Sequence, residues 1–124
     1  MRKLGLVLFF GVGVGIVVAG TASAETWKAG LALVTEKSPA ACAQPETAKV
    51  SWELTLEGNS FSGVSNAGAR FSTTADADGA VKTTYSGIVG VSKYFVELSG
   101  NARTRQIELH NTQYGCFFRL VPTP

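Results

Sequence analysis

The sequence predicts an all-β protein, a small antiparallel up-and-down barrel of about eight strands that one disulfide closes. Apolar and polar residues alternate in short runs, which is the period of half-buried antiparallel strands. Clusters of Gly, Asn and Asp separate these runs, and the chain has two widely spaced cysteines, Cys42 and Cys116. A two-sheet β-sandwich is the alternative architecture, because the spacing of turns alone does not separate the two.

Residues 1–24 have the features of a secretory signal peptide. Arg2 and Lys3 precede an apolar run, and an Ala-x-Ala motif that ends at Ala24 is typical of a cleavage site. Glycines interrupt the run, which is shorter than the roughly 20 residues of a membrane-spanning helix. We therefore expect residues 25–124 to form a single domain in the periplasm or outside the cell, with no membrane span after cleavage.

The charges after the expected cleavage site balance. Two of the 11 basic residues precede the site, which leaves nine, and all nine acidic residues follow it. The basic residues form no block of the kind that nucleic-acid binders and membrane-surface binders carry. The composition therefore gives no indication of a nucleic-acid partner.

Cys42 and Cys116 are expected to form a disulfide, because export places them in an oxidising compartment. Closing so long a loop stabilises a folded domain by about 4 kcal/mol in the chain-entropy model. A catalytic redox pair is normally a local C-x-x-C motif, and these two cysteines lie far apart. A structural role is therefore expected.

The alternation places the first five strands at residues 26–34, 49–57, 60–65, 69–73 and 80–90. Three more strands are expected around residues 94–99, 107–110 and 116–120, with a break at Gly100-Asn101 between the first two of these. One large side chain marks each of the eight: Trp27, Trp52, Phe61, Phe71, Tyr85, Tyr94, Ile107 and Phe118.

The cysteine positions support this order of strands. In an eight-stranded meander, the end of the first strand lies beside the start of the last. Cys42 follows the first strand and Cys116 begins the last. The disulfide would therefore hold together the seam at which the barrel closes.

The sequence contains no motif that specifies a reaction, a metal or a cofactor. His110 is the only histidine, and no known nucleophile or metal-ligand motif surrounds it. Asp76 and Asp78 resemble part of a calcium loop, but no bidentate Glu follows at the required distance, so a turn is expected there. We expect a protein that is not an enzyme and binds no metal or cofactor.

Two sets of residues are candidates for binding. Trp27 and Trp52 face inward, where they either fill the core or line a cavity for a small ligand. If the strand order is right, four loops emerge at one end of the barrel, a place where binding is often located. The candidate binding rim at that end consists of Ser65, Arg70, Lys93, His110 and Tyr114.

Two resemblances accompany these patterns. Trp27, Thr35-Glu36-Lys37, Cys42 and Gly115-Cys116 resemble a broad set of small exported bacterial β-proteins of uncharacterised function, and this resemblance implies the fold alone. The segment 65–71, Ser-Asn-Ala-Gly-Ala-Arg-Phe, is similar to the S-x-S-G-A-R-Y segment of the bacterial inhibitors of C-type lysozyme.

The second resemblance implies an exported eight-stranded barrel that blocks the active cleft of a lysozyme. In that family, a serine of this segment and a later lysine in an F-W-x-K-G motif enter the cleft. Here Ala67 replaces the second serine, Phe71 replaces the tyrosine, and the nearest later lysine, Lys82, lacks the motif.

We therefore expect an exported, non-enzymatic barrel that binds an unknown protein or small ligand. A periplasmic inhibitor of C-type lysozyme is the first alternative, and a carrier of a small hydrophobic ligand, which requires an empty interior, is the second.

Overall fold

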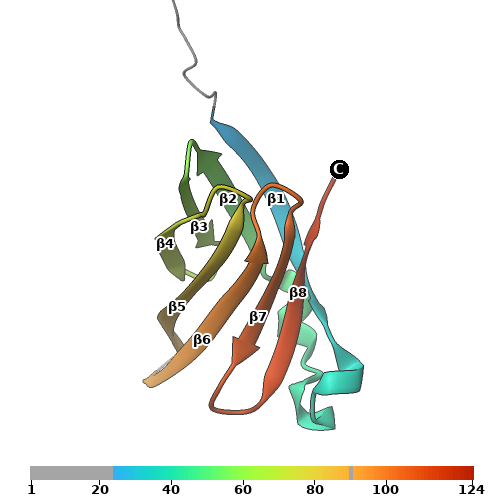
Figure 1. Ribbon diagram of the computed structural model, residues 1–124. Helices are drawn as coiled ribbons and strands as arrows, with labels where there is room; N and C mark the ends of the chain where they lie inside the picture. Colours follow the sequence, from blue (N-terminus) through green and yellow to red (C-terminus); the bar gives the residue numbers. More distant parts are fainter. Residues whose placement is uncertain (1–23, 90) are drawn as a thin grey trace, which may run out of the picture.

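The computed structural model describes residues 24–89 and 91–124, so the expected signal peptide lies almost wholly outside the described residues. Eight antiparallel strands form one sheet that curls into a nearly closed barrel (Figure 1). The strands are β1 (Glu25–Leu33), β2 (Ser51–Glu57), β3 (Ser60–Ser65), β4 (Arg70–Thr74), β5 (Ala80–Val89), β6 (Ser92–Asn101), β7 (Gln106–Asn111) and β8 (Cys116–Pro122). The barrel is confirmed over the β-sandwich, and each marker residue lies on its own strand.

The order of strands in the sheet is β4-β3-β2-β1-β8-β7-β6-β5. The first and last strands of the chain therefore pair, from Ala29 opposite Pro122 to Leu33 opposite Phe118. The sheet ends at β4 and β5, which follow one another in the chain without being paired to each other. The barrel closes where the cysteine positions predict, and its interruption lies on the opposite side, at what we call the β4–β5 junction.

Side chains, in place of backbone hydrogen bonds, bridge the β4–β5 junction. The rings of Phe71 on β4 and Tyr85 on β5 are stacked, with centroids 6.1 Å apart and planes at 19°. Trp52 lies beside both rings, 5.6 Å from Phe71 and 5.5 Å from Tyr85. Such aromatic pairs contribute about 0.5–1.5 kcal/mol beyond the burial of their area.

The remaining inward side chains fill the barrel with one apolar core. Its central members are completely or almost completely buried, namely Leu54, Phe61, Leu98, Ile107 and Leu120. Alternation along each strand puts these residues inside and polar residues outside, as on β2, where Trp52, Leu54 and Leu56 are buried and Ser51, Glu53 and Glu57 are exposed. The core explains why the period of two identifies the strands.

The expected break at Gly100-Asn101 is wrong, because β6 continues through both residues. Gly100 pairs with Val81 on one side and Ile107 on the other. A Cβ atom at Gly100 would lie 2.1 Å from the backbone oxygen of Gln106, so glycine permits a close approach of two strands here. The turn follows, and the Asn101 side-chain oxygen accepts the backbone N–H groups of Arg103 and Thr104.

The long connection between β1 and β2 contains three short 3-10 turns, η1 (Thr35–Lys37), η2 (Ala40–Cys42) and η3 (Pro45–Lys49). Cys42 in η2 is bonded to Cys116 at the start of β8, with the two Cα atoms 5.7 Å apart. The predicted disulfide is confirmed. Within the described residues, no helix is long and apolar enough to cross a membrane.

Candidate functional site

One end of the barrel, which we call the disulfide end, carries the connection 34–50, the β3–β4 turn (66–69), the β5–β6 turn and the β7–β8 turn (112–115). The antiparallel strand order requires this placement, and Figure 1 shows the 3-10 turns near its bottom edge, where β6 and β8 also begin. The four loops predicted to share one end of the barrel do so. The loops of a rigid scaffold are common places for binding.

The connection 34–50 is fixed to the barrel at several points beside the disulfide. The Ser38 hydroxyl accepts the N–H of Phe117 (2.9 Å) and donates to its carbonyl (3.3 Å). The Lys37 ammonium lies 3.3 Å from Glu108 and 5.1 Å from the centre of the Phe117 ring. The segment therefore lies against β7 and β8 as an ordered part of the surface.

A groove of about 380 Å³ lies between this connection and the β7–β8 turn. Tyr114 lines it and is 66% exposed, while the Asn111 side-chain oxygen holds the turn by accepting the N–H groups of Gln113 and Tyr114. The other lining residues are mostly apolar or uncharged: Pro39, Ala41, Cys42, Gln44, Thr47, Asn111, Cys116 and Phe118. The disulfide itself thus forms part of a binding-sized hollow.

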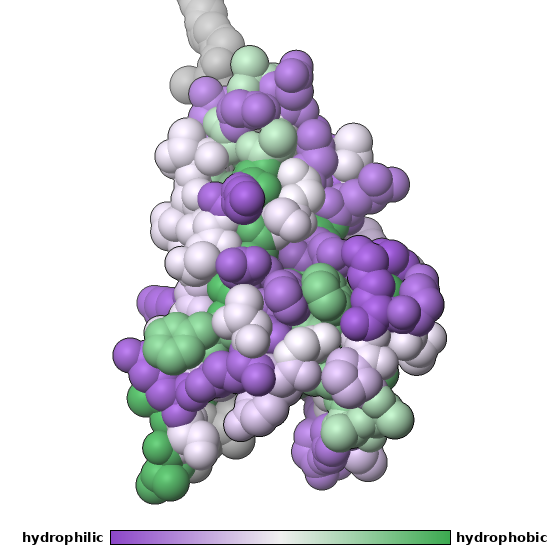
Figure 2. Space-filling model, turned by 60° about the horizontal axis from the view of Figure 1, so that its bottom comes forward, coloured by the Kyte–Doolittle hydropathy of each residue, from purple (hydrophilic) through white to green (hydrophobic). Residues whose placement is uncertain are grey.

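The tip of the β5–β6 hairpin exposes large apolar side chains at the same end. Ile88 is 68% exposed, Phe95 is 47% exposed, and Val91 in the turn is fully exposed. Lys93 lies over the Phe95 ring, with its ammonium 5.5 Å from the ring centre. Figure 2, which brings this end forward, shows hydrophobic side chains at the lower left, where this hairpin ends.

The β3–β4 turn has its serine turned inward. Ser65 is only 7% exposed, and its hydroxyl accepts the backbone N–H groups of Ala67 (3.2 Å) and Ala69 (3.1 Å). Asn66 holds the turn to β2 because its side chain bonds the backbone of Ser51 and Lys49. Of the predicted rim residues, Ser65 therefore supports the turn, and Arg70, the first residue of β4, is exposed.

His110 lies on the outer face of β7 within a polar and aromatic cluster. Its ring is stacked on Phe117, with centroids 4.0 Å apart, and its Nδ1 atom lies 3.6 Å from a Glu97 carboxylate oxygen. The Lys37 ammonium also lies over the Phe117 ring and so belongs to the same cluster. His110 thus packs against strand neighbours on the barrel wall, away from the groove that Tyr114 lines.

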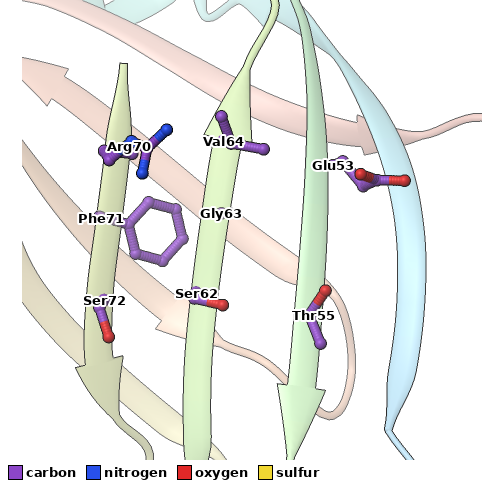
Figure 3. A pocket seen from close by; sticks show the side chains of 8 residues that line it. All are labelled: Glu53, Thr55, Ser62, Gly63, Val64, Arg70, Phe71 and Ser72. Atoms are coloured by element: carbon purple, nitrogen blue, oxygen red, sulfur yellow. The ribbon is translucent and has the colours of Figure 1, made fainter. Parts of the chain in front are cut away.

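A second groove, of about 550 Å³, lies on the outside of β2, β3 and β4 and is more polar (Figure 3). Along one row of strand partners, Val64 stands between Arg70 and Glu53. Serine and threonine side chains form the next row, and the Phe71 ring covers Gly63 from inside. Arg70 thus joins the disulfide end to an open polar face.

Trp27 and Trp52 lie in the packed core, 5% and 3% exposed, and the two grooves are lined by other residues. The indole N–H of Trp27 is buried and has no hydrogen-bond partner among the described residues. Arg105 covers that ring at 5.3 Å and also lies 3.8 Å from Glu25. Both tryptophans therefore pack as core residues at their positions.

Two inward tyrosines lie close to the β4–β5 junction. Burial raises the pKa of Tyr85 far above its usual value, and the neighbouring Tyr94 raises it further. Burial also raises the pKa of Tyr94. The Tyr94 ring lies over Gly87, where a Cβ atom would be 2.3 Å from the Tyr94 hydroxyl. Both tyrosines are therefore neutral at physiological pH.

Asp76 and Asp78 form the β4–β5 turn, as expected. One Asp76 carboxylate oxygen accepts the N–H groups of Asp78 and Ala80, both at 2.9 Å. Across residues 24–89 and 91–124, no three His, Cys, Asp or Glu side chains are grouped so that they could hold a metal ion.

Comparison of this chain with protein-family models, curated proteins and solved structures found no match. The contacts within the structure are therefore the guide to its function.

Sequence reasoning missed Ile88, Val91 and Phe95 as surface residues. The signal was present, because Ile88 stands at an outward position of the β5 alternation and Phe95 interrupts the alternation between Tyr94 and Val96. Apolar residues at positions expected to face solvent indicate an interaction surface.

Proposed function

We propose that this chain is an exported, non-enzymatic binding protein whose disulfide end contacts a protein partner. The observation that carries the proposal is the concentration there of exposed apolar side chains, Ile88, Val91, Phe95 and Tyr114. Exposed aromatic residues are enriched where proteins meet, because they bury a large area and lose little conformational entropy. The disulfide, which is typical of proteins that fold outside the cytosol, supports the extracytoplasmic location.

The fixed loops of this end favour tight binding. The Cys42–Cys116 bond, the Ser38 hydrogen bonds and the Asn66 side chain each hold a separate part of this end against the barrel. A surface that is already ordered loses less entropy when it binds, so more of the contact energy appears as affinity. A carrier of small hydrophobic ligands has less support, because such a carrier needs an empty interior and the inward side chains here form one packed core.

Site-specific photo-crosslinking tests this proposal. A benzoylphenylalanine at Tyr114 or Phe95 is expected to form an adduct with a single partner in the cells that express the protein. The matched control is Val121, an apolar residue of comparable exposure (46%) toward the other end of β8, which should form no such adduct. An adduct at Val121 alone, or at none of the three positions, would contradict the proposal.

A C-type lysozyme is a second candidate partner, favoured by the resemblance of residues 65–71. The segment forms a hydrogen-bonded turn at the disulfide end with Arg70 exposed beside it, and this position supports contact with a lysozyme cleft. Ser65 is occupied within the turn, so Arg70 would have to make the contact with the cleft. Purified protein in large molar excess should then slow the lysis of a cell-wall suspension by C-type lysozyme, and Arg70→Ala should restore lysis. Unchanged lysis would remove this candidate.

A further inference from the structure

We propose that the partner binds as an extended, acidic segment that adds a strand to the open edge of β5 at the disulfide end. The inference rests on the proposed function, because it specifies how the partner is held. It concerns the backbone of β5 around Ser86 and Ile88, together with the charges on both sides of the β4–β5 junction.

The hydrogen-bond register shows which backbone groups of β5 are open. The carbonyl of Gly79 accepts the N–H of Ala102, so odd-numbered residues here face β6. The β5–β6 register then runs without interruption from Ala80 to Val89. Backbone direction alternates along a strand, so the N–H and C=O groups of Ser86 and Ile88 face the opposite edge. Within the described residues, no strand pairs with that edge.

The lower part of β5 extends beyond its neighbour. Tyr85 is level with Phe71, the second residue of β4, because their rings are stacked. β4 begins one residue earlier, at Arg70, whereas β5 continues for four more residues to Val89. Ser86 is thus level with Arg70 without being paired to it, and the edge of β5 after Ser86 lies beside no described strand.

This edge lacks the usual protection against pairing. Natural proteins blunt exposed strand edges with prolines, bulges or charged residues. Residues 83–92 contain no proline and no charged residue, and the β5–β6 register shows no bulge. An unprotected edge next to exposed apolar side chains is the arrangement that binds extended peptides by adding a strand.

The neighbouring side chains indicate what the added strand carries. On the outer face, Ile88 is paired with Lys93, and Ser86 is paired with Phe95. On an added strand, the side chain of the residue opposite Ile88 would lie next to Ile88. It would also be a diagonal neighbour of Ser86, on the same face. An apolar residue at that position would cover Ile88, and an acidic residue two positions along the added strand would share the outer face with Lys93.

The charges around the junction favour an acidic segment. β4, β5 and the first half of β6, as far as Val96, carry Arg70, Lys82 and Lys93 and no acidic residue, although acidic and basic residues are equal in number after residue 24. Asp76 and Asp78 lie in the β4–β5 turn, at the end of the junction away from the disulfide. None of these three cations forms an ion pair with a described residue. Complementary charge sets the register of a bound segment and speeds its encounter.

A proline substitution separates strand addition from side-chain contact. Proline is tolerated on an edge strand where its missing N–H would face outward, so Ser86→Pro should leave the β5–β6 ladder intact while preventing pairing on the open edge. The matched control is Ser72→Pro on β4. The carbonyl of Ala69 accepts the N–H of Ser65, and the N–H of Ala75 donates to the carbonyl of Asn59, so odd-numbered residues of β4 face β3. The N–H of Ser72 therefore faces the open edge of β4. Near-ultraviolet circular dichroism of both variants tests whether they fold.

The probe is a phage-displayed library of linear twelve-residue peptides, selected on the purified protein. Enriched peptides should carry an acidic residue near an apolar one and should slow hydrogen exchange at the Ser86 and Ile88 amides. Ser86→Pro should weaken their binding by at least about tenfold, the size expected when one or two backbone hydrogen bonds are lost. Methylation of alternate backbone nitrogens in the peptide should weaken binding to a similar extent, while Ser72→Pro should bind normally.

Three results would overturn strand addition at β5. These are a failure to enrich any peptide, unchanged binding by Ser86→Pro, and equal loss in both proline variants, which would indicate insertion between β4 and β5. Sedimentation of the free protein tests pairing of two copies, and a dimer that Ser86→Pro dissociates would overturn the acidic partner by showing that a second copy occupies the edge. Crosslinks at Tyr114 and Phe95 that persist with Ser86→Pro would leave the proposed function standing and remove only this inference.

Discussion

The β1–β8 seam and the β4–β5 junction are the two places where the ring of strands has to close, and different forces join them. At the seam, five pairs of residues face one another in register, and the disulfide adds a covalent link beside them. At the junction, strands that are consecutive in the chain are not paired, and stacked rings lie between them. Distant segments are thus joined by specific bonds, whereas adjacent segments are left with an open edge.

The comparison teaches that the bonds that close this barrel and the backbone groups that remain open lie on different sides of it. The backbone groups of β1 and β8 are paired along the seam, so only side chains there are open to a partner. The junction has backbone groups that only another chain or water can satisfy. A change at the seam should therefore affect unfolding, and a change at the open edge of β5 should affect binding.

The largest effect is expected from removal of the disulfide. The Cys42→Ser, Cys116→Ser double variant should lose about 4 kcal/mol of unfolding free energy, because its unfolded chain is no longer closed into a long loop. Urea denaturation followed by far-ultraviolet circular dichroism measures the change. A loss below about 1 kcal/mol would mean that strand pairing at the seam suffices without the covalent link.

Truncation of Phe71 should have the next largest effect. Phe71→Ala should cost about 3 kcal/mol, since it leaves a cavity and removes the ring that bridges β4 to Tyr85. The matched control is Phe95→Ala, an exposed phenylalanine whose loss should cost about 1 kcal/mol or less. Equal losses in the two variants would show that stacking does not hold the junction.

Alkaline pH should weaken the junction selectively. Unfolded tyrosine ionises at about pH 10, whereas burial raises the pKa of Tyr85 and Tyr94 in the folded state. Above pH 10 the folded state therefore binds more protons than the unfolded state, so the unfolding free energy falls as pH rises. Urea midpoints between about pH 8 and pH 11.5 should decline, and Tyr85→Phe should decline less. An equal decline in both proteins would contradict this account.

The smallest effect is expected beside the seam, where an ion pair joins η1 to β7. The Lys37–Glu108 pair is half-exposed on the lysine side, so its coupling energy should be below about 1 kcal/mol and should weaken further in about 1 M salt. A double-mutant cycle with Lys37→Met and Glu108→Gln measures this coupling. A value of several kcal/mol would mean that this ion pair, more than the disulfide, holds the connection.

Much of the fold could be predicted because alternation reports burial directly. Trp52, Leu54 and Leu56 are inside, and their neighbours are outside, so the period of two located β2 and most other strands. The prediction of a break at Gly100-Asn101 was wrong because glycine is common both in turns and where two strands approach closely. Only the close approach of the Gln106 backbone shows that the second case applies here. Whether β4 pairs with β5 depends on how the whole sheet curls, so it could not be read from the sequence of either strand.

The candidate site was less predictable for a related reason. Topology placed the loops correctly, but the side-chain direction of Ser65 depends on local hydrogen bonds to Ala67 and Ala69. β4 and β5 are not paired, and the rings of Trp52, Phe71 and Tyr85, which come from three strands, meet at that junction. Neither feature produces a periodic pattern or a characteristic residue spacing in the sequence.

Because β1 pairs with β8, the two ends of the barrel domain lie side by side and could be joined. Thr123 donates its N–H to the carbonyl of Lys28, so the last residues lie beside the first strand. A short linker could join Pro124 to Glu25, and a new opening within 76–79 would leave every ladder of the sheet intact. Such a circular permutant would carry its termini at the end of the β4–β5 junction away from the disulfide, and a peptide fused there could run along the open edge of β5 toward Ile88.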